Sequence, residues 1–315
     1  MNKSLTEILD IKYPIIMAPM FLVSNAKMLI AGINNGVAAA VPALNYRTDE
    51  EFRAAIDEVR AKTKGGALGV NLIVNKSNPK MPAQLKTCVD KKVDFIITSL
   101  GSPREVIKQC KPHGIKVFCD VVDLKFALIV QELGADAIIA VNSKAGGHAG
   151  PKTPEELIPL LAEKCTIPVI SAGGVGNASQ MDDVLALGAV GASVGSIFIA
   201  SDESDVSEEY KQACVDYGAK DIVLSTKVSG TPCTVINTPY VQKIGTKQNW
   251  FERLLSKSKR LKKWVKMLTF AKGMKRLQKS AFSATYKTVW CAGPTIEHTT
   301  AIKPVAEIIK GLVSN

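Results

Sequence analysis

The sequence predicts an α/β protein, a closed (β/α)₈ TIM barrel with a small C-terminal appendage that contains a basic amphipathic helix. Eight short apolar runs, rich in β-branched residues, recur at intervals of roughly 20–30 residues, the size of one βα unit. Amphipathic stretches alternate with these runs, which indicates a parallel sheet buried on both faces. The lack of an obvious reversal in strand order favours a closed barrel over an open doubly wound sheet, the alternative that the pattern leaves open.

The elements of the barrel follow from these runs in chain order. Helical periodicity over 50–62 places Phe52, Ile56 and Val59 on one face, and a second helix at 124–133 stops at Gly134. The eight strands are expected at 14–18, 37–41, 67–71, 95–98, 116–120, 137–141, 168–172 and 189–194.

The repeat of βα units ends near residue 199, and the remaining chain divides between two regions. A last helix at 302–312 would complete the outer layer of the barrel, so the barrel domain is expected at 1–204 plus 297–315. Residues 205–296 are expected to form a smaller lid region on the substrate side. It would contain a helix at 207–217 and short strands at 222–228 and 234–236.

Composition places the chain among cytoplasmic globular proteins. Of its 315 residues 46% are hydrophobic and 22% are charged, and no apolar run is long enough to span a membrane. The N-terminus lacks the basic and then apolar order of a signal peptide. The seven cysteines form no C-x-x-C pair, which fits buried free thiols in a reducing compartment better than disulfides or a zinc site.

The net charge of +11 comes from one segment of the chain. Residues 253–296 carry twelve Lys or Arg and no acidic residue, so the rest of the chain has a net charge of −1. Because the barrel shows no basic stripe, nucleic acid is not an expected partner. Within the segment, Leu261, Trp264, Val265 and Leu268 form one apolar stripe. This helix is interpreted as a lid over the barrel mouth. Alternatively, residues 253–279 bind an acidic partner or an anionic membrane surface.

Glycine-rich loops follow the last two strands of the predicted barrel. Gly173 and Gly174 come after strand seven, and Gly195 and Ser196 after strand eight. Backbone N–H groups at the start of a helix bind phosphate, and many barrels use this position for that purpose. The sequence therefore predicts a phosphate site, with tight βα turns as the alternative reading of the glycines.

A histidine lies in a third glycine-rich loop, after strand six. His148, in the run Ala145-Gly146-Gly147-His148-Ala149-Gly150, is a candidate acid or base at the barrel mouth. His113 precedes a strand and His298 opens the expected last helix, and both are interpreted as structural. Asn71 and Asp120 end strands and face the same mouth, where each would bind a ligand or the loop backbone.

Several kinds of chemistry lack support in the sequence. There is no H-E-x-x-H motif, no paired carboxylates and no G-x-S-x-G motif, so neither a metal site nor serine acyl transfer is expected. Neither a Rossmann fingerprint nor a P-loop is present.

The motifs together resemble the nitronate monooxygenase family, formerly 2-nitropropane dioxygenases, which includes flavin-dependent enoyl-acyl-carrier-protein reductases. The resemblance covers roughly residues 10–240 and is most specific at the loop of His148. The motifs that carry it are Ala18-Pro19-Met20, Gly69-Val70-Asn71, 145–150, 170–175, 187–189, Gly195-Ser196 and, near the end, Trp290-Cys291-Ala292-Gly293.

The resemblance implies a barrel that binds FMN and catalyses redox chemistry. It puts the FMN phosphate on Gly173, Gly174, Gly195 and Ser196, and it puts Ala18, Met20 and Asn71 around the isoalloxazine ring with Gly147 beside the site. His148 matches the catalytic histidine of the family. Asp120 is a departure, because some of these monooxygenases have a lysine there; an acid disfavours negative charge on a reduced flavin.

The expected activity is the FMN-dependent oxidation of alkyl nitronates with O₂. The alternatives are an NAD(P)H-dependent enoyl-acyl-carrier-protein reductase and a flavin-binding protein that docks to an anionic partner or membrane. In each case the substrate or partner differs while the cofactor stays the same. A homodimer is left open.

Overall fold

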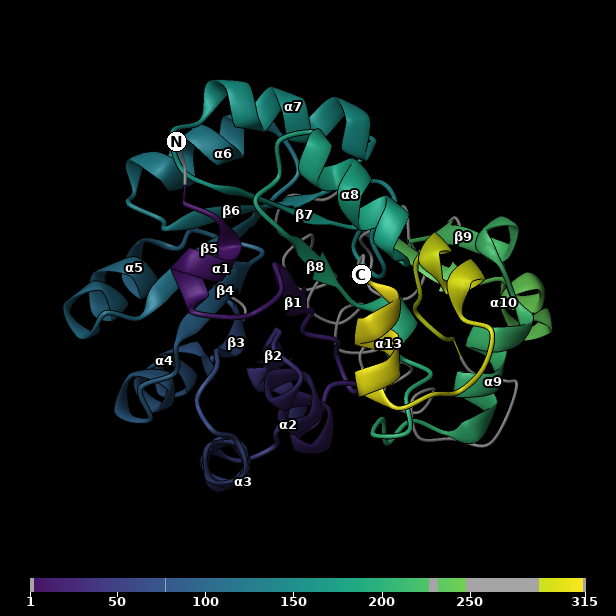
Figure 1. Cartoon of the computed structure of the whole chain (residues 1–315), viewed down its shortest axis with the longest axis horizontal. Helices are drawn as coiled ribbons and strands as arrows, with labels where there is room; N and C mark the ends of the chain where they lie inside the picture. Colours follow the sequence, from purple (N-terminus) through teal and green to yellow (C-terminus); the bar gives the residue numbers. More distant parts are fainter. Residues whose placement is uncertain (1–2, 77, 227–231, 248–288, 314–315) are drawn as a thin grey trace, which may run out of the picture.

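The computed structural model describes residues 3–76, 78–226, 232–247 and 289–313. Its centre is a barrel of eight parallel strands that closes where β1 pairs with β8, so the predicted barrel is confirmed (Figure 1). The strands are β1 (Ile15–Met17), β2 (Ala38–Pro42), β3 (Leu68–Ile73), β4 (Phe95–Ser99), β5 (Lys116–Val121), β6 (Ala137–Val141), β7 (Val169–Ala172) and β8 (Ala192–Val194).

Strand β8 begins at Ala192, three residues later than the sequence predicted. The N–H of Ala189 bonds to the carbonyl of Val184 at 3.1 Å, which still belongs to the turn after the preceding helix. Gly191 then passes so close to Leu5 that a Cβ atom there would lie 2.5 Å from the Leu5 side chain. Residues 190 and 191 still bond to β7, because the Val190 N–H donates to the Val169 carbonyl at 2.8 Å and the Gly191 carbonyl accepts from the Ser171 N–H at 2.9 Å. The regular strand starts at Ala192, where pairing with β1 begins.

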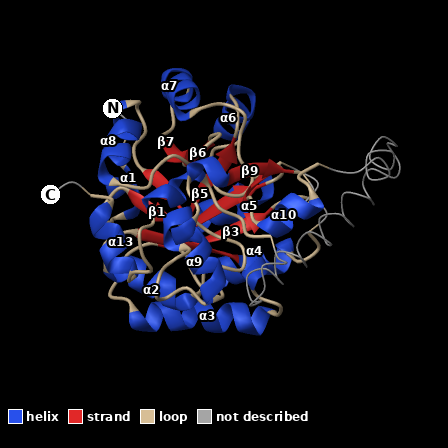
Figure 2. Ribbon diagram, turned by 90° about the vertical axis from the view of Figure 1, so that its right-hand side faces the viewer, coloured by secondary structure: helices blue, strands red, loops and turns tan. Residues whose placement is uncertain are grey.

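Helices cover the outside of the barrel (Figure 2). Helix α3 (Asp49–Lys62) begins at a capping box of Thr48 and Glu51 and buries Phe52, Ile56 and Val59, as its periodicity predicts. The other helices of this layer are α2 (Ala26–Asn34), α4 (Met81–Asp90), α5 (Arg104–Cys110), α6 (Leu124–Glu132), α7 (Pro154–Lys164) and α8 (Ala178–Ala186).

The core separates into two layers because successive strand residues point to opposite faces. One cluster fills the inside of the barrel and includes Ile97, Phe118, Ile139 and Ile170. The larger cluster lies between the strands and the surrounding helices. Leu5 and Leu9 of α1 (Leu5–Leu9) join the inner cluster from the N-terminal end of the strands, where α1 covers the barrel (Figure 1). The opposite end, at which the strands terminate, is the mouth.

The chain beyond β8 forms a group of short elements beside the barrel (Figure 1). Strands β9 (Ile222–Ser225) and β10 (Cys233–Ile236) pair antiparallel. The predicted apolar stripe at 261–268 lies outside the described residues, as does most of the basic segment. The remaining elements are η3 (Ser196–Phe198), α9 (Glu208–Asp216), η4 (Ala219–Asp221), α10 (Pro239–Ile244), η5 (Pro294–His298) and α13 (Val305–Gly311).

Helix α13 starts later than the expected 302, because Pro304 occupies its N-cap. His298 therefore does not open this helix, contrary to the prediction: it ends η5. None of the described helices is both long enough and apolar enough to cross a membrane.

Candidate active site

The uppermost layer of inward-facing residues forms the floor of the mouth. Ser99, Asp120, Val141 and Ala172 each lie two positions after a member of the inner cluster, so their side chains point the same way. Asn71 follows Gly69 in the same manner, and Gly69 packs against the ring of Phe95. The floor is therefore polar over β3, β4 and β5, and is made of small apolar groups over β6 and β7.

Asn71, Ser99 and Asp120 form a hydrogen-bonded chain across three neighbouring strands. The Asn71 Nδ2 donates to the carbonyl of Ile97 at 3.1 Å and to the Ser99 Oγ at 2.7 Å. The Ser99 hydroxyl donates to Asp120 Oδ2 at 2.5 Å. Asn71 and Asp120, both predicted to face the mouth, are thus joined through Ser99, a strand-end residue to which the sequence assigned no role.

The carboxyl group of Asp120 has an unusual affinity for a proton. Burial raises its pKa from 3.8 to about 6, and the hydrogen bond from Ser99 opposes that rise. Asp120 therefore changes charge within the range in which most enzymes work.

The two glycine loops after β7 and β8 leave backbone donors at the mouth. Gly173 has a φ of +106°, and a Cβ atom there would lie 2.4 Å from the backbone nitrogen of Ala145. Within the described part of the chain, the N–H groups of Gly174, Gly195 and Ser196 have no protein acceptor. The Ser196 hydroxyl is engaged, since it accepts from the N–H of Gly293 at 2.8 Å. The hydroxyl keeps its own proton, so this loop offers both backbone N–H groups and the Ser196 O–H to a ligand.

Close approaches of backbone glycines show that the loops after β1 and β6 lie beside the loop after β8. A Cβ atom at Gly195 would lie 3.5 Å from Ala18 and from Met20, which follow β1. A Cβ atom at Gly146 would lie 2.6 Å from the Ser196 hydroxyl and 3.1 Å from the Gly293 nitrogen. The loops after β1, β6, β7 and β8 and the segment at Gly293 therefore converge around one end of the barrel.

His148 lies on the loop after β6, at the edge of the mouth. Thr234 of β10 holds this loop, because its N–H donates to the Gly147 carbonyl at 2.7 Å and its hydroxyl to the Ala145 carbonyl at 3.0 Å. The histidine keeps an exposed surface, yet the protein atoms around its ring lower its pKa from 6.5 by desolvation. At neutral pH the imidazole is uncharged and can accept a proton.

Comparison with known proteins decides the family. The model of the nitronate monooxygenase family matches residues 2–315. The chain belongs to the nitronate monooxygenase family. It is therefore an enzyme of the oxidoreductase class, as the sequence motifs predicted.

Individual relatives of this family member differ in their named reactions. A probable nitronate monooxygenase of Staphylococcus aureus is 27% identical over 288 residues, covering 77% of this chain and 81% of that protein. A hydroxy-methyl-oxo-octahydro-indene-carboxyl-CoA dehydrogenase of Rhodococcus jostii is 29% identical over 244 residues, covering 78% of this chain and 68% of that protein.

Solved structures of the family share the whole fold. FabK of Thermotoga maritima superposes with a TM-score of 0.83 at 27% identity, covering 99% of this chain and 95% of that chain. Nitroalkane oxidase of Streptomyces ansochromogenes has a TM-score of 0.80 at 22% identity, covering 98% and 96%, which shows the fold alone.

A second asparagine, Asn142, was missed by sequence reasoning although it also follows a strand. Its fully buried amide donates to the Gly173 carbonyl at 3.0 Å and accepts from the Lys144 N–H at 2.9 Å. It thereby joins the histidine loop to the first glycine loop. The signal was available, because Asn142 directly follows the apolar run of β6 at the carboxyl end of that strand.

Of the two other histidines, one lies at the closed end of the barrel and one lies beside the loop after β7. His113 ends η2 (Lys111–His113) before β5, at the closed end of the barrel, and is exposed. His298 packs beside Gly176, and its Nδ1 lies 3.4 Å from the amide of Asn177, so it has the partner that the sequence did not indicate. No cluster of His, Cys, Asp or Glu that could hold a metal ion is found among the described residues.

Proposed function

We propose that this member of the nitronate monooxygenase family is an FMN-dependent oxidoreductase that oxidises alkyl nitronates with O₂. The observation that carries the proposal is the meeting of the loop of His148 with two glycine loops at the barrel mouth of a chain matched by the family over residues 2–315. Small-molecule chemistry at this mouth follows the general rule for barrels of this type.

The mouth fits the proposed cofactor. The N–H groups of Gly174, Gly195 and Ser196 would bind the phosphate of FMN, and Gly173 leaves room for the approach because it has no side chain. Ala18, Met20 and Asn71 would surround the ring, with Gly147 beside it. Bound FMN supplies the acceptor for electrons from the substrate.

His148 would act on the proton and the charge of the substrate. Because desolvation lowers its pKa, it is neutral at pH 7 and can remove the acidic proton of a nitroalkane or donate a hydrogen bond to a nitronate oxygen. With a nitroalkane as substrate, kcat/KM should therefore stay level above pH 6.5 and fall as the pH drops through the lowered pKa. The pH profile of kcat/KM measures this.

A second candidate function is supported by the relatives. FabK at 27% identity and the carboxyl-CoA dehydrogenase at 29% favour an NAD(P)H-dependent enoyl-acyl-carrier-protein reductase, which would use the same cofactor site. The two functions differ in what reduces the flavin. A nitronate does so in the first, and NAD(P)H does so in the second.

Anaerobic mixing of the purified yellow protein tests the proposal. We expect a nitronate to bleach the flavin absorbance and NAD(P)H to leave it unchanged. The reverse result would establish the reductase instead. Bleaching by neither would leave a flavin-binding protein that docks to an anionic partner, and a protein that binds no FMN would overturn all three.

His148→Gln tests the role of the histidine in the same assay. We expect the variant to retain FMN and to lose about 10²–10⁴-fold in turnover with a nitroalkane, the range ascribed to a general base. His113→Gln, which removes an imidazole at the closed end, is the matched control. Full activity of His148→Gln would mean that its imidazole is structural.

The proposal extends to the partner, the oligomeric state and the cellular location of the enzyme. We retain the acidic partner for 253–279 because twelve basic residues without an acidic one attract such a surface in a salt-dependent way. The homodimer and the cytoplasmic location also remain proposals. All seven cysteines are free thiols, which fits a reducing compartment.

A further inference from the structure

Asp120 is an acid at the barrel mouth that the proposed function does not use. Its side chain continues the inward face of β5 above Phe118, so it lies on the floor on which a ligand would rest. Most aspartates in such a position are paired with a cation. Here burial and the Ser99 bond account for the perturbed proton affinity, and no charged neighbour among the described residues contributes.

The elements packed against β5 bring few other charges to this position. Strand β4 contributes the hydroxyl of Ser99, and β6 contributes the apolar Val141. The loop after β6 carries His148 and Lys144, of which Lys144 is 3.3 Å from Glu155. Cys119, the neighbour of Asp120 on the strand, faces the outer layer and accepts a bond from Thr98. Asp120 is therefore the acid of this layer, and its charge is compensated by hydrogen bonding alone.

The geometry fixes the direction of each bond in the chain of Asn71, Ser99 and Asp120. The carbonyl of Ile97 can only accept, so the Asn71 Nδ2 must be the donor on that side. A hydroxyl has a single proton, and Ser99 gives it to Asp120 while accepting from Asn71. When Asp120 is protonated, its own O–H can donate to Ser99 instead. The chain thus accommodates Asp120 in both charge states.

We propose that Asp120 is a proton-storing acid of the site, which takes up a proton from solvent when negative charge arrives at the mouth, and that Ser99 sets the pH at which it does so. The step converts the carboxylate and one solvent proton into the carboxylic acid, with no change of oxidation state. For the source of the negative charge, an anionic nitronate or electrons on bound FMN, this inference rests on the proposed function.

The direction of the effect follows from electrostatics. With a pKa of about 6, Asp120 is mostly ionised at pH 7 in the free site. A second negative charge a few ångströms away raises the pKa of an acid further, so the arriving charge shifts Asp120 towards its neutral form. The site then gains no net negative charge. This resolves the difficulty that an acid at this position poses for a reduced flavin.

The number of protons that the FMN-loaded protein takes up when its flavin is reduced by two electrons tests the proposal. This number is obtained from the slope of the midpoint potential of bound FMN against pH. Between pH 7 and 8, where Asp120 of the free site is mostly ionised, wild type should take up as much as about one proton more than Asp120→Asn. Asp120→Glu should restore the extra proton. The hydrogen bond from Ser99 lowers the pKa of Asp120, so Ser99→Ala should raise that pKa. The pH range in which the extra proton is taken up should therefore move to higher pH.

Two control variants separate Asp120 from its neighbours. Thr98→Val removes a hydroxyl that bonds Cys119 and should leave the proton count unchanged. If Asp120→Asn takes up as many protons as wild type and His148→Gln takes up fewer, the histidine stores the proton and the proposal is overturned.

A measurement on flavin-free protein distinguishes this inference from the proposed function. In the infrared difference between wild type and Asp120→Asn, we expect a carboxylic acid band that is present at pH 5 and absent at pH 8. No such band would overturn the proton-storing role, whether or not FMN binds. Failure to bind FMN with the band present would overturn the proposed function and leave the titrating acid in place.

Discussion

Gly173 shows how strongly a single residue can constrain this site. Its φ of +106° is a conformation that residues with a side chain rarely adopt, and the space beside it is filled by Ala145 and by the Asn142 amide. The loop of His148 and the first glycine loop therefore touch at this point through backbone atoms. A side chain there would separate two loops that the proposed function needs together.

We predict that Gly173→Ala lowers FMN affinity at least tenfold, since backbone strain of about 1–3 kcal/mol and displaced loops both fall on the phosphate site. Titration of flavin fluorescence measures the dissociation constant. Gly65→Ala is the matched control, because Gly65 has a similar φ of +86° but nothing within 4 Å. Equal losses of affinity in the two variants would show that Gly173 does not shape the site.

The residues of the site differ in how readily the sequence reveals them. His148, Asn71 and Asp120 could be assigned to the mouth because each lies near the carboxyl end of an apolar strand, and these ends meet at one end of a barrel. Asn71 and Asp120 were expected to end their strands, but β3 continues to Ile73 and β5 to Val121. Ser99 could not be assigned a role in the same way. The role of Ser99 depends on the register of β4 between β3 and β5, because this register places the Ser99 hydroxyl between Asn71 and Asp120.

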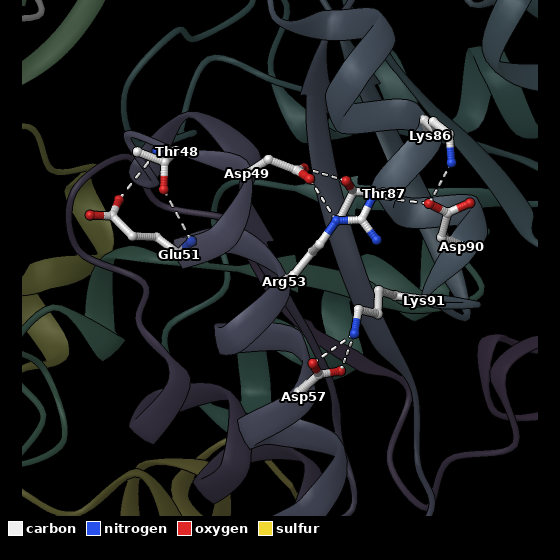
Figure 3. Close-up of polar contacts among 9 residues, drawn as sticks. All are labelled: Thr48, Asp49, Glu51, Arg53, Asp57, Lys86, Thr87, Asp90 and Lys91. Atoms are coloured by element: carbon white, nitrogen blue, oxygen red, sulfur yellow. Dashed lines mark hydrogen bonds and ion pairs between the residues drawn. The ribbon is translucent and has the colours of Figure 1, made fainter.

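At the scale of elements, helices α3 and α4 are joined by a network of charged groups (Figure 3). Arg53 of α3 is 2.6 Å from Asp49 and 2.9 Å from Asp90 of α4, and Thr87 donates to Asp49. The Thr87 bond and then Arg53 lower the pKa of Asp49, while Lys86 and then Arg53 lower that of Asp90. These groups lie partly in solvent, so their contribution to stability is expected to be small.

We predict that Arg53→Gln lowers the melting temperature slightly at pH 7 and that the difference from wild type disappears in acid. Because the carboxyl pKa values are depressed in the folded state, their stabilisation is present above the unfolded value of about 3.8 and is lost as the pH falls through the folded values. Thermal melts from pH 3 to 7 measure this. Lys62→Gln, on the same helix, removes only an exposed pair with Glu58 and should show a smaller effect. An undiminished difference at pH 3 would assign the effect of Arg53 to packing.

Element boundaries were predictable where a local signal marks them. Helix α3 begins at Asp49, directly after its N-cap Thr48, where Thr48 and Glu51 form a capping box, and α6 ends before Gly134, whose φ is +91°. The start of β8 was not predictable, because residues 189–191 are apolar like a strand. Val190 and Gly191 already bond to β7, and pairing with β1 begins only at Ala192, a difference that no local signal in the sequence marks.

At the scale of the whole molecule, the two ends of the barrel differ in the residues that line them. At the mouth lie the polar chain, the glycine loops and His148, and at the opposite end α1 covers the barrel (Figure 1). Leu5 is fully buried there, and its N–H bonds to the carbonyl of Val190 at 3.2 Å. Since the barrel interior is solid core between the two ends, a change at one end should leave the geometry of the other intact.

We predict that Leu5→Ala lowers the free energy of unfolding by about 2–5 kcal/mol, the usual cost of a cavity left by a fully buried leucine, without changing FMN affinity. Urea denaturation and flavin titration, performed on the same samples, measure the two quantities. Ile8→Ala, in the same helix but only partly buried against the inner cluster, should cost less stability. Loss of FMN affinity in folded Leu5→Ala, at a urea concentration far below its midpoint, would show that the closed end and the mouth are coupled through the barrel interior.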